Sequence, residues 1–200
     1  MRRLTKIFTA AVLAGATLLG SSAAFAEANA NIPKLGDDGL YHPSFEMETF
    51  KDLRDDLKEA NASGKRLLII VEQRGCIYCK KMETEVFPDP AIHKLLTDKY
   101  FVDIFNMWGD THVTDFDGKV LTEKEAVRRW GVNFTPTMIF LPETVPAGKT
   151  AAQAAVLTVP GAFGKITTRG MLLYVLDRAY EKGEGLQQFL KDGKGAEVEN

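Results

Sequence analysis

The segment LLIIVEQRGCIYCKKM (residues 67–82) carries the pattern that decides the fold. Its first part, residues 67–71, is a continuous apolar run rich in β-branched side chains, which is typical of a strand covered on both faces. Residues 73–75, Gln73-Arg74-Gly75, end with a glycine, which is typical of a turn. A helix is expected to begin after this turn. The segment therefore predicts a buried strand that leads directly into a helix carrying Cys76 and Cys79 in its first turn.

On either side of this segment, apolar residues recur with helical or strand periods, so that helices and strands alternate along the chain. Such an order predicts an α/β domain with a central mixed sheet of four to five strands and helices on both faces. The expected helices cover residues 44–60 (with Ser44 as N-cap), 91–96, 123–130 (with Thr122 as N-cap), 168–180 and 186–190; further strands are expected at 100–105, 137–141 and 156–159.

The first 26 residues have the layout of a secretory signal peptide. A short basic start (residues 1–6) precedes an apolar stretch (residues 7–20) and an Ala-x-Ala site that ends at Ala26. A membrane anchor or an organelle transit peptide are the alternatives, but the apolar stretch is shorter than the roughly 20 residues that span a bilayer. We expect cleavage after Ala26, export, and no stable membrane insertion of the mature chain.

Four regions are expected along the chain. A loose lead-in (residues 27–43) follows the signal peptide, a single domain covers residues 44–182 with an insertion at about 106–121, and a charged tail covers residues 183–200. The whole chain has a net charge of −2. All charged residues that cleavage would remove are basic. No basic stripe remains in the mature chain that would favour nucleic acid or an anionic membrane as a partner.

The chain has two cysteines, and both lie in the Cys76-Ile77-Tyr78-Cys79 motif. Unpaired N–H groups at a helix start favour a thiolate, so we expect Cys76 to be the nucleophile and Cys79 the resolving thiol. A zinc site is one alternative, but it needs more ligands than two cysteines; the three histidines are dispersed, and neither a metal nor another cofactor is expected. An inert structural disulfide is the other alternative, although so short a loop gains little stability.

Residues 65–96, together with Gly131–Thr137, resemble the thioredoxin superfamily, and the resemblance implies the thioredoxin fold. More narrowly, Glu72, the glycine before Cys76 and the Cys-x-Tyr-Cys-Lys-Lys-Met motif look like periplasmic thioredoxins of the SoxW type, which occur with bacterial sulfur-oxidation systems. The resemblance implies a cis peptide bond between Thr135 and Pro136 that faces the cysteines, and a partner chain that contacts Thr135, Pro136, Ile77 and Tyr78. An ordinary trans-proline at the start of a strand is the alternative.

The sequence departs from the family pattern close to the cysteines. Gly75 replaces the usual aromatic residue before the first cysteine, and Ile70 stands where many thioredoxins have a buried aspartate. Glu72 is then the nearest carboxylate along the chain. If it is close and partly buried, Glu72 is a candidate proton acceptor for Cys79; a solvated charge at the end of the strand is the alternative.

The resemblance implies a periplasmic thiol:disulfide oxidoreductase that reduces disulfides of partner proteins, such as those of a sulfur-oxidation system, and is recharged by a membrane thiol electron donor. An oxidase or isomerase of secreted proteins is an alternative, since Thr135 before the proline also occurs in periplasmic disulfide isomerases. A redox-inactive binding module is a third. Elsewhere, Trp108 and Trp130 are expected to pack in or near the core, and the aspartates of the insertion to be solvated.

Overall fold

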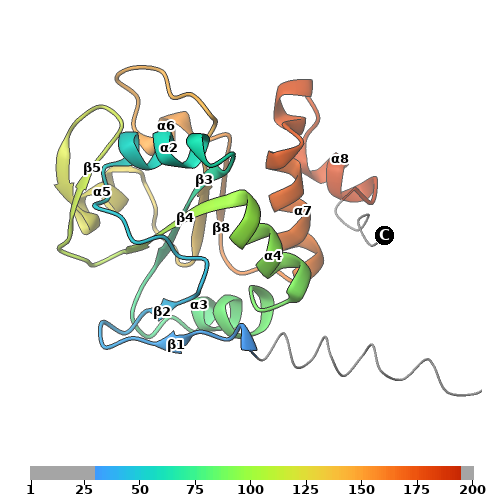
Figure 1. The fold of residues 1–200 in the computed structure, drawn as a ribbon, viewed down its shortest axis with the longest axis horizontal. Coiled ribbons are helices and arrows are strands. Elements are labelled where there is room, and N and C mark those ends of the chain that lie inside the picture. Colours follow the sequence, from blue (N-terminus) through green and yellow to red (C-terminus); the bar gives the residue numbers. More distant parts are fainter. Residues whose placement is uncertain (1–29, 195–200) are drawn as a thin grey trace, which may run out of the picture.

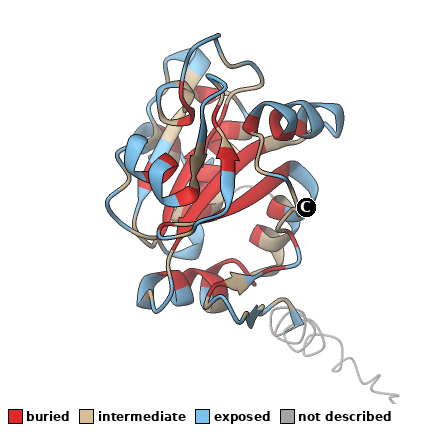
Figure 2. Ribbon diagram, turned by 90° about the vertical axis from the view of Figure 1, so that its left-hand side faces the viewer, coloured by how far each residue is buried: buried red, intermediate tan, exposed pale blue. Residues whose placement is uncertain are grey.

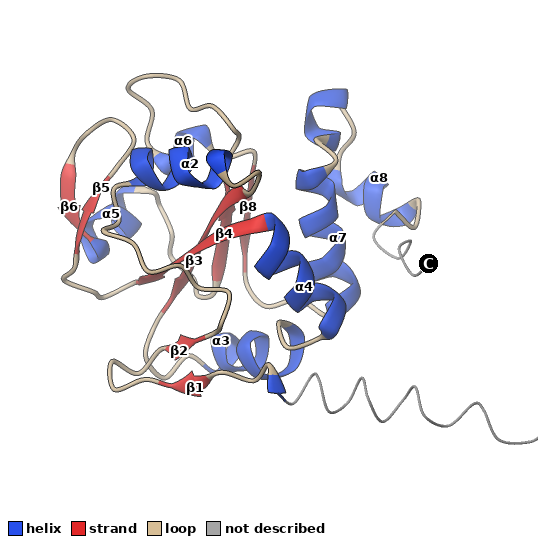
Figure 3. Cartoon of the chain, viewed as in Figure 1, coloured by secondary structure: helices blue, strands red, loops and turns tan. Residues whose placement is uncertain are grey.

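The computed structural model describes residues 30–194 and has a four-stranded central sheet in the order β4-β3-β7-β8 (Figures 1 and 3). The predicted signal peptide, its cleavage site after Ala26 and residues 195–200 lie outside the described residues. Strand β3 (Arg66–Glu72) is parallel to β4 (Tyr100–Asn106) and antiparallel to β7 (Thr137–Phe140), which pairs antiparallel with β8 (Leu157–Pro160). The predicted α/β class with a mixed sheet is confirmed.

Strand β3 is the centre of the core because the apolar run that forms it has side chains on both faces of the sheet. Leu67, Ile69 and Val71 belong to one apolar cluster, whereas Leu68 and Ile70 belong to the other. All five are essentially inaccessible to solvent, and Figure 2 shows that burial is concentrated on the central strands. Each such side chain contributes roughly 1.5–3 kcal/mol through the removal of its surface from water.

Helices cover both faces of the sheet (Figure 1). Helix α3 (Ile77–Lys81) continues into the π-helical turn η1 (Met82–Val86), and the Leu68 face packs against η1, α4 (Pro90–Lys99) and α7 (Lys165–Leu176). This face is extended by η2 (Ala179–Lys182) and α8 (Leu186–Lys191). The Leu67 face packs against α2 (Leu53–Ala62), α5 (Glu123–Arg129) and the short α6 (Ala151–Ala154). Among residues 30–194, no helix combines the length and the apolar character that a bilayer crossing requires.

The helix expected from residue 44 begins instead at Leu53, so the predicted N-cap at Ser44 is wrong. Asp52 is the N-cap, and its side chain accepts a hydrogen bond of 3.1 Å from the backbone N–H of Arg54. The chain before it runs along the edge of the sheet, where the Met47 N–H donates to the Val102 carbonyl at 2.9 Å. The apolar residues that suggested an early helical turn are therefore used by an extended segment.

The lead-in expected to be loose contains a small hairpin of β1 (Lys34–Leu35) and β2 (Tyr41–His42). Leu40, directly before β2, is buried in the main core. Burial of this side chain anchors the hairpin to the domain. The hairpin lies beside α3, the helix that follows Cys76 (Figure 3).

The insertion also forms a hairpin, of β5 (His112–Thr114) and β6 (Val120–Thr122). Asp115 was expected to be solvated but is fully buried, because its carboxylate accepts hydrogen bonds from Trp130 Nε1 and from the Ala151 N–H, each at 2.9 Å. Asp110 and Asp117 are exposed, as expected for the rest of the insertion. Trp130 packs in the core, whereas Trp108 is 67% exposed.

A buried ion cluster ties the extended segment before α2 to the sheet. Lys51 Nζ lies 2.8 Å from Glu123 Oε1 and 3.5 Å from Asp103 Oδ1, and it also donates to the Ile104 carbonyl. Burial raises the pKa of Asp103 to about 7, although the Lys51 charge opposes this shift. The ammonium therefore stabilises two carboxyl groups that have little access to water.

Candidate active site

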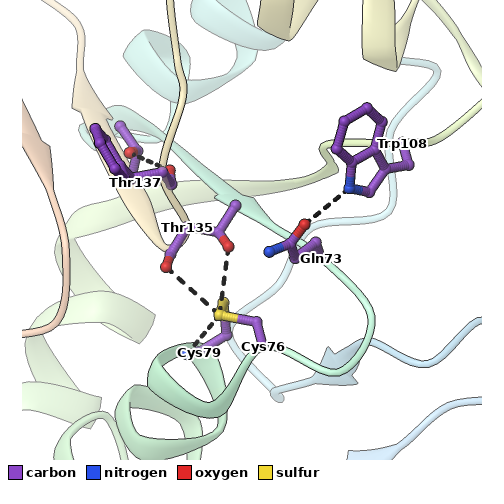
Figure 4. The surroundings of a disulfide bond; sticks show 7 residues. Gln73, Cys76, Cys79, Trp108, Thr135 and Thr137 are labelled. Carbon is purple, nitrogen blue, oxygen red and sulfur yellow. Dashed lines mark hydrogen bonds between the residues drawn. A yellow bond between two sulfur atoms is a disulfide. The ribbon is translucent and has the colours of Figure 1, made fainter.

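Cys76 and Cys79 form a disulfide at the point where β3 leads into α3 (Figure 4). Cys76 is the N-cap residue of α3, and its Sγ accepts a hydrogen bond of 3.0 Å from the Cys79 N–H. Cys76 is partly accessible to solvent, whereas Cys79 is 2% exposed. The two sulfur atoms therefore differ in access: a partner can reach the first, while the second lies behind it.

The loop between β3 and α3 turns sharply at Gly75. Its φ is +73°, in the left-handed region that a residue with a side chain adopts only at a cost. The glycine that replaces the family's aromatic residue at this position thus has a local conformational reason. Before it, the side chain of Gln73 accepts a hydrogen bond of 2.8 Å from Trp108 Nε1.

Thr135 faces the disulfide from the loop before β7, and its peptide bond with Pro136 is cis. The carbonyl oxygen of Thr135 lies 3.5 Å from Cys76 Sγ, and its hydroxyl donates a hydrogen bond to the same sulfur at 3.3 Å (Figure 4). Pro136 is buried. The structure therefore brings two segments that are far apart in the sequence to one sulfur atom.

Glu72 is buried, not solvated: it is 1% exposed, at the end of β3. Because side chains alternate along a strand, it points to the same face as Ile70, toward the helix that carries the cysteines. Glu72 and Cys79 line one pocket beside α3. Burial raises the pKa of Glu72 to about 7.

Glu83, in η1, is a second buried carboxyl group, which the sequence analysis missed. It follows Cys79 by four residues, about one helical turn, and is fully inaccessible to solvent. Its carboxyl group lies close enough to that of Glu72 for each to shift the other's pKa. In the described part of the chain neither Glu83 oxygen has a hydrogen-bond partner.

Two buried carboxyl groups this close resist ionising together, because each negative charge disfavours the other. Burial, and then the Glu72 charge, raises the pKa of Glu83 well above its usual range. Glu72 is therefore the group of the pair that ionises more readily.

Four large apolar side chains are exposed on the loops and the helix around Cys76. Ile77 and Tyr78 stand on α3 between the cysteines, Phe134 precedes Thr135, and Trp108 follows β4; each is more than half exposed. Figure 4 shows Thr135 above Cys76, with Gln73 and Trp108 to the upper right of the cysteine. Such a cluster of exposed apolar groups on a monomer is typical of a surface that binds a partner.

The residues proposed from the sequence thus lie together, and the structure adds Glu83, Gln73 and Trp108 to their surroundings. A hint for Glu83 was present in the sequence, because a residue four positions after Cys79 shares its helix face. Across residues 30–194, no three His, Cys, Asp or Glu side chains gather in a way that could hold a metal ion.

The mixed sheet, the covering helices and the cysteine pair at the end of β3 define the thioredoxin fold. Residues 53–154, just over half of the chain, match the family model described as a thioredoxin-like domain, and the chain belongs to this family. A thioredoxin from Thermus thermophilus has the same fold, with a TM-score of 0.51 and 24% identity over 67% of this chain and 91% of that one. So has a thioredoxin-fold protein from Helicobacter pylori, with a TM-score of 0.51 and 15% identity over 66% and 86% of the chains.

Among curated proteins, the chain is similar to the thiol:disulfide interchange protein DsbD of Colwellia psychrerythraea, with 28% identity over 100 residues. The match covers 50% of this chain but 15% of that much longer protein. Family membership, this similarity and the Cys76–Cys79 disulfide support thiol–disulfide chemistry in general.

Proposed function

We propose that the protein is a periplasmic thiol:disulfide oxidoreductase that reduces disulfides of partner proteins. The observation that carries the proposal is that two donors converge on Cys76 Sγ: the Cys79 N–H at 3.0 Å and the Thr135 hydroxyl at 3.3 Å. The Thr135 carbonyl oxygen, an acceptor, lies 3.5 Å from the same sulfur. Hydrogen bonds donated to a sulfur favour its thiolate form, which is the nucleophile in disulfide exchange.

The reaction starts from the dithiol protein. The Cys76 thiolate attacks one sulfur of the partner's disulfide, a Cys76–partner bond forms, and the other partner sulfur leaves as a thiolate. Cys79 then attacks Cys76 Sγ and releases the second partner thiol, so two electrons have passed to the partner. The buried position of Cys79 directly behind Cys76 limits its contact with any other disulfide.

Cys79 must lose its proton before it attacks, and we assign the acceptor role to Glu72. A base works best when its pKa is near the working pH, and burial raises the pKa of Glu72 to about 7. Burial and the Glu72 charge raise the pKa of Glu83 well above its usual range, so Glu72 is the group of the pair that exchanges a proton with Cys79. Both Glu72 and Cys79 line the pocket beside α3, which gives the proton a way to solvent.

The periplasmic location follows from the predicted signal peptide with cleavage after Ala26, and the reducing direction from the resemblance to SoxW-type thioredoxins. On this proposal a membrane thiol donor recharges the protein, and its partners belong to a sulfur-oxidation system. The partner's extended chain would run past Thr135 and Pro136 and over Ile77 and Tyr78, which are exposed beside the sulfur.

The test is reduction of insulin disulfides with dithiothreitol as the electron source. We expect the native chain to accelerate the reaction and Cys76→Ser to abolish the acceleration. In a separate reaction without dithiothreitol, pre-reduced Cys79→Ser should accumulate a covalent complex between Cys76 and insulin. Exchange that survives Cys76→Ser would contradict the proposal and favour a binding module with incidental cysteines.

The direction is tested by equilibrating the Cys76–Cys79 couple with glutathione. A reduction potential near −270 mV, as in thioredoxin, is expected for a reductase, and about −120 mV for a strong disulfide donor. A value at the oxidising end would contradict the reductase assignment and favour the oxidase or isomerase alternative.

A further inference from the structure

A pocket of about 570 Å³ opens between the β1–β2 hairpin and α3, directly beside the disulfide. The hairpin forms one wall with Leu35, Leu40 and Tyr41, and the opposite wall includes Cys76 and Ile77. The hairpin comes from a part of the chain that precedes the residues matched by the thioredoxin-like family model. The pocket is therefore an addition to the shared fold, and it is continuous with the reactive sulfur.

The hairpin wall is held in place before any partner arrives. Arg74, in the loop before Cys76, donates hydrogen bonds to the carbonyls of Asp37 at 3.1 Å and Asp38 at 3.2 Å. At Gly39 the φ is +82°, and a Cβ there would lie 2.5 Å from Arg74 Nε, so the turn fits closely against the arginine side chain. A preformed wall binds a ligand without first losing entropy.

The exposed rim of this wall is apolar. Leu35 is 59% exposed although it belongs to a strand, and it faces the same pocket as Ile77, which is 72% exposed. The Asp38 and His42 side chains of the hairpin pair with each other at 3.2 Å and do not line the pocket. The lining also contains the charged residues Asp37, Arg74 and Lys80. Leu35, Leu40, Tyr41 and Ile77 nevertheless give the pocket an apolar strip that fits an apolar side chain.

The geometry of an extended chain decides which partner residue reaches the pocket. When a partner cysteine points down toward Cys76, the residues next to it point away, because side chains alternate along an extended chain. The residues two positions from the cysteine point down again, about 7 Å along the chain at roughly 3.4 Å per residue. Cys76 is itself one of the residues that line the pocket, so a partner chain that crosses the pocket would bring one of these two positions over it.

We infer that the pocket between the β1–β2 hairpin and α3 receives an apolar side chain located two residues from the reactive cysteine of an extended partner segment. The inference rests on the proposed function and specifies its substrate class: disulfides flanked at that position by a residue such as leucine. The chain direction of the partner decides whether the residue precedes or follows its cysteine.

The test uses disulfide-linked homodimers of short peptides, so that either sulfur gives the same products. The parent peptide is Ser-Gly-Cys-Gly-Ser, and leucine replaces the first serine, the last serine or a glycine next to the cysteine. The dithiol protein is mixed with each dimer, and the released peptide thiol is followed over a single turnover. The disulfide of cysteamine, which has no flanking residues, reports the intrinsic reactivity of each protein variant.

We expect leucine at one of the two outer positions to raise the second-order rate constant by about tenfold over the parent peptide, as one apolar group in an apolar pocket does. Leucine next to the cysteine should leave the rate unchanged within about twofold. Leu35→Ser should reduce the preference to about threefold, since it removes part of the apolar wall from an exposed position that does not affect folding. Val120→Ser, an equally exposed apolar site on the other hairpin, is the matched control and should keep the full preference.

Equal rates for all four peptides would overturn the inference, and so would a preference that Leu35→Ser and Val120→Ser both leave intact. A concentration-dependent dimer that Leu35→Ser abolishes would also overturn it, because a second copy of the chain would then occupy the pocket. Failure to reduce any peptide or the cysteamine disulfide would overturn the proposed function as well. Reduction without preference would leave that function standing.

Discussion

Replacing Glu72 by glutamine is expected to stabilise the oxidised protein at alkaline pH and to have little effect at acid pH. Glu72 is buried against Glu83, and burial raises its pKa from the ordinary 4.5 to about 7. A carboxyl group whose pKa is higher in the folded than in the unfolded state binds its proton more tightly when folded. Its unfavourable effect on stability is therefore absent below about pH 4.5 and complete above about pH 7.

The size of the effect follows from the two pKa values. Each pKa unit corresponds to about 1.4 kcal/mol, so a change from 4.5 to about 7 corresponds to about 3 kcal/mol at about pH 8. Glutamine has nearly the same shape, carries no charge at any pH and can donate to Glu83. The free energy of unfolding of Glu72→Gln should then exceed that of the native chain by up to about 3 kcal/mol at alkaline pH.

Urea unfolding followed by tryptophan fluorescence, at about pH 4 and about pH 8 without reductant, measures this difference. Glu85→Gln is the matched control: it lies in the same helical turn as Glu83, but its side chain is exposed. The reasoning would be refuted if Glu72→Gln changed stability equally at both pH values, or if it destabilised the protein at about pH 8.

Three further substitutions test other contacts. Thr135→Val removes the hydroxyl that donates to Cys76 Sγ at 3.3 Å and should raise the pKa of the reduced Cys76 thiol by about 0.5–1 unit. Thiolate absorbance against pH measures this pKa, and an unchanged titration would contradict a role for the hydrogen bond. Asp115→Ala leaves two buried N–H donors unpaired and should lower the free energy of unfolding by about 3 kcal/mol in urea; a loss below about 1 kcal/mol would contradict the buried network. Lys51→Met leaves the carboxyl groups of its cluster without a cation and should destabilise the protein by about 3–5 kcal/mol at about pH 8. The loss should be smaller at about pH 5, where Asp103 is protonated, and equal losses at both pH values would argue against the ion cluster.

The core of the fold could be predicted from the sequence because it depends on local patterns. The five-residue apolar run that forms most of β3 has no other stable place than the interior of a sheet, and Thr122 with a glutamate three residues later forms the predicted helix start before α5. The apolar pattern from Phe45 to Leu57 was ambiguous. Its first part pairs with the edge strand β4, and only its later part is helical. The pairing depends on contacts with a distant part of the chain, which the periodicity of the apolar residues cannot predict.

The candidate site was predictable where its residues form motifs and unpredictable where it depends on burial. Cys76, Cys79, Thr135 and Pro136 belong to short motifs, and the structure brings them together. For Glu72 the sequence left burial and solvation equally open, because the last residue of a strand can be either. Asp115 looked like part of a solvated loop, since the N–H groups that bury it come from residues 15 and 36 positions away.

Because of the hairpin at the start of the described chain, the reactive cysteines and the wall beside them come from different segments of the sequence. The sulfur chemistry is encoded in residues 66–83 and the Thr135 loop, whereas the wall beside it is encoded in residues 34–42 and contacts the loop through Arg74. Substitutions at the exposed face of β1 can therefore accumulate without disturbing either cysteine. If that wall selects partners, substitutions in residues 34–42 would change which proteins are reduced and would leave the redox centre unchanged.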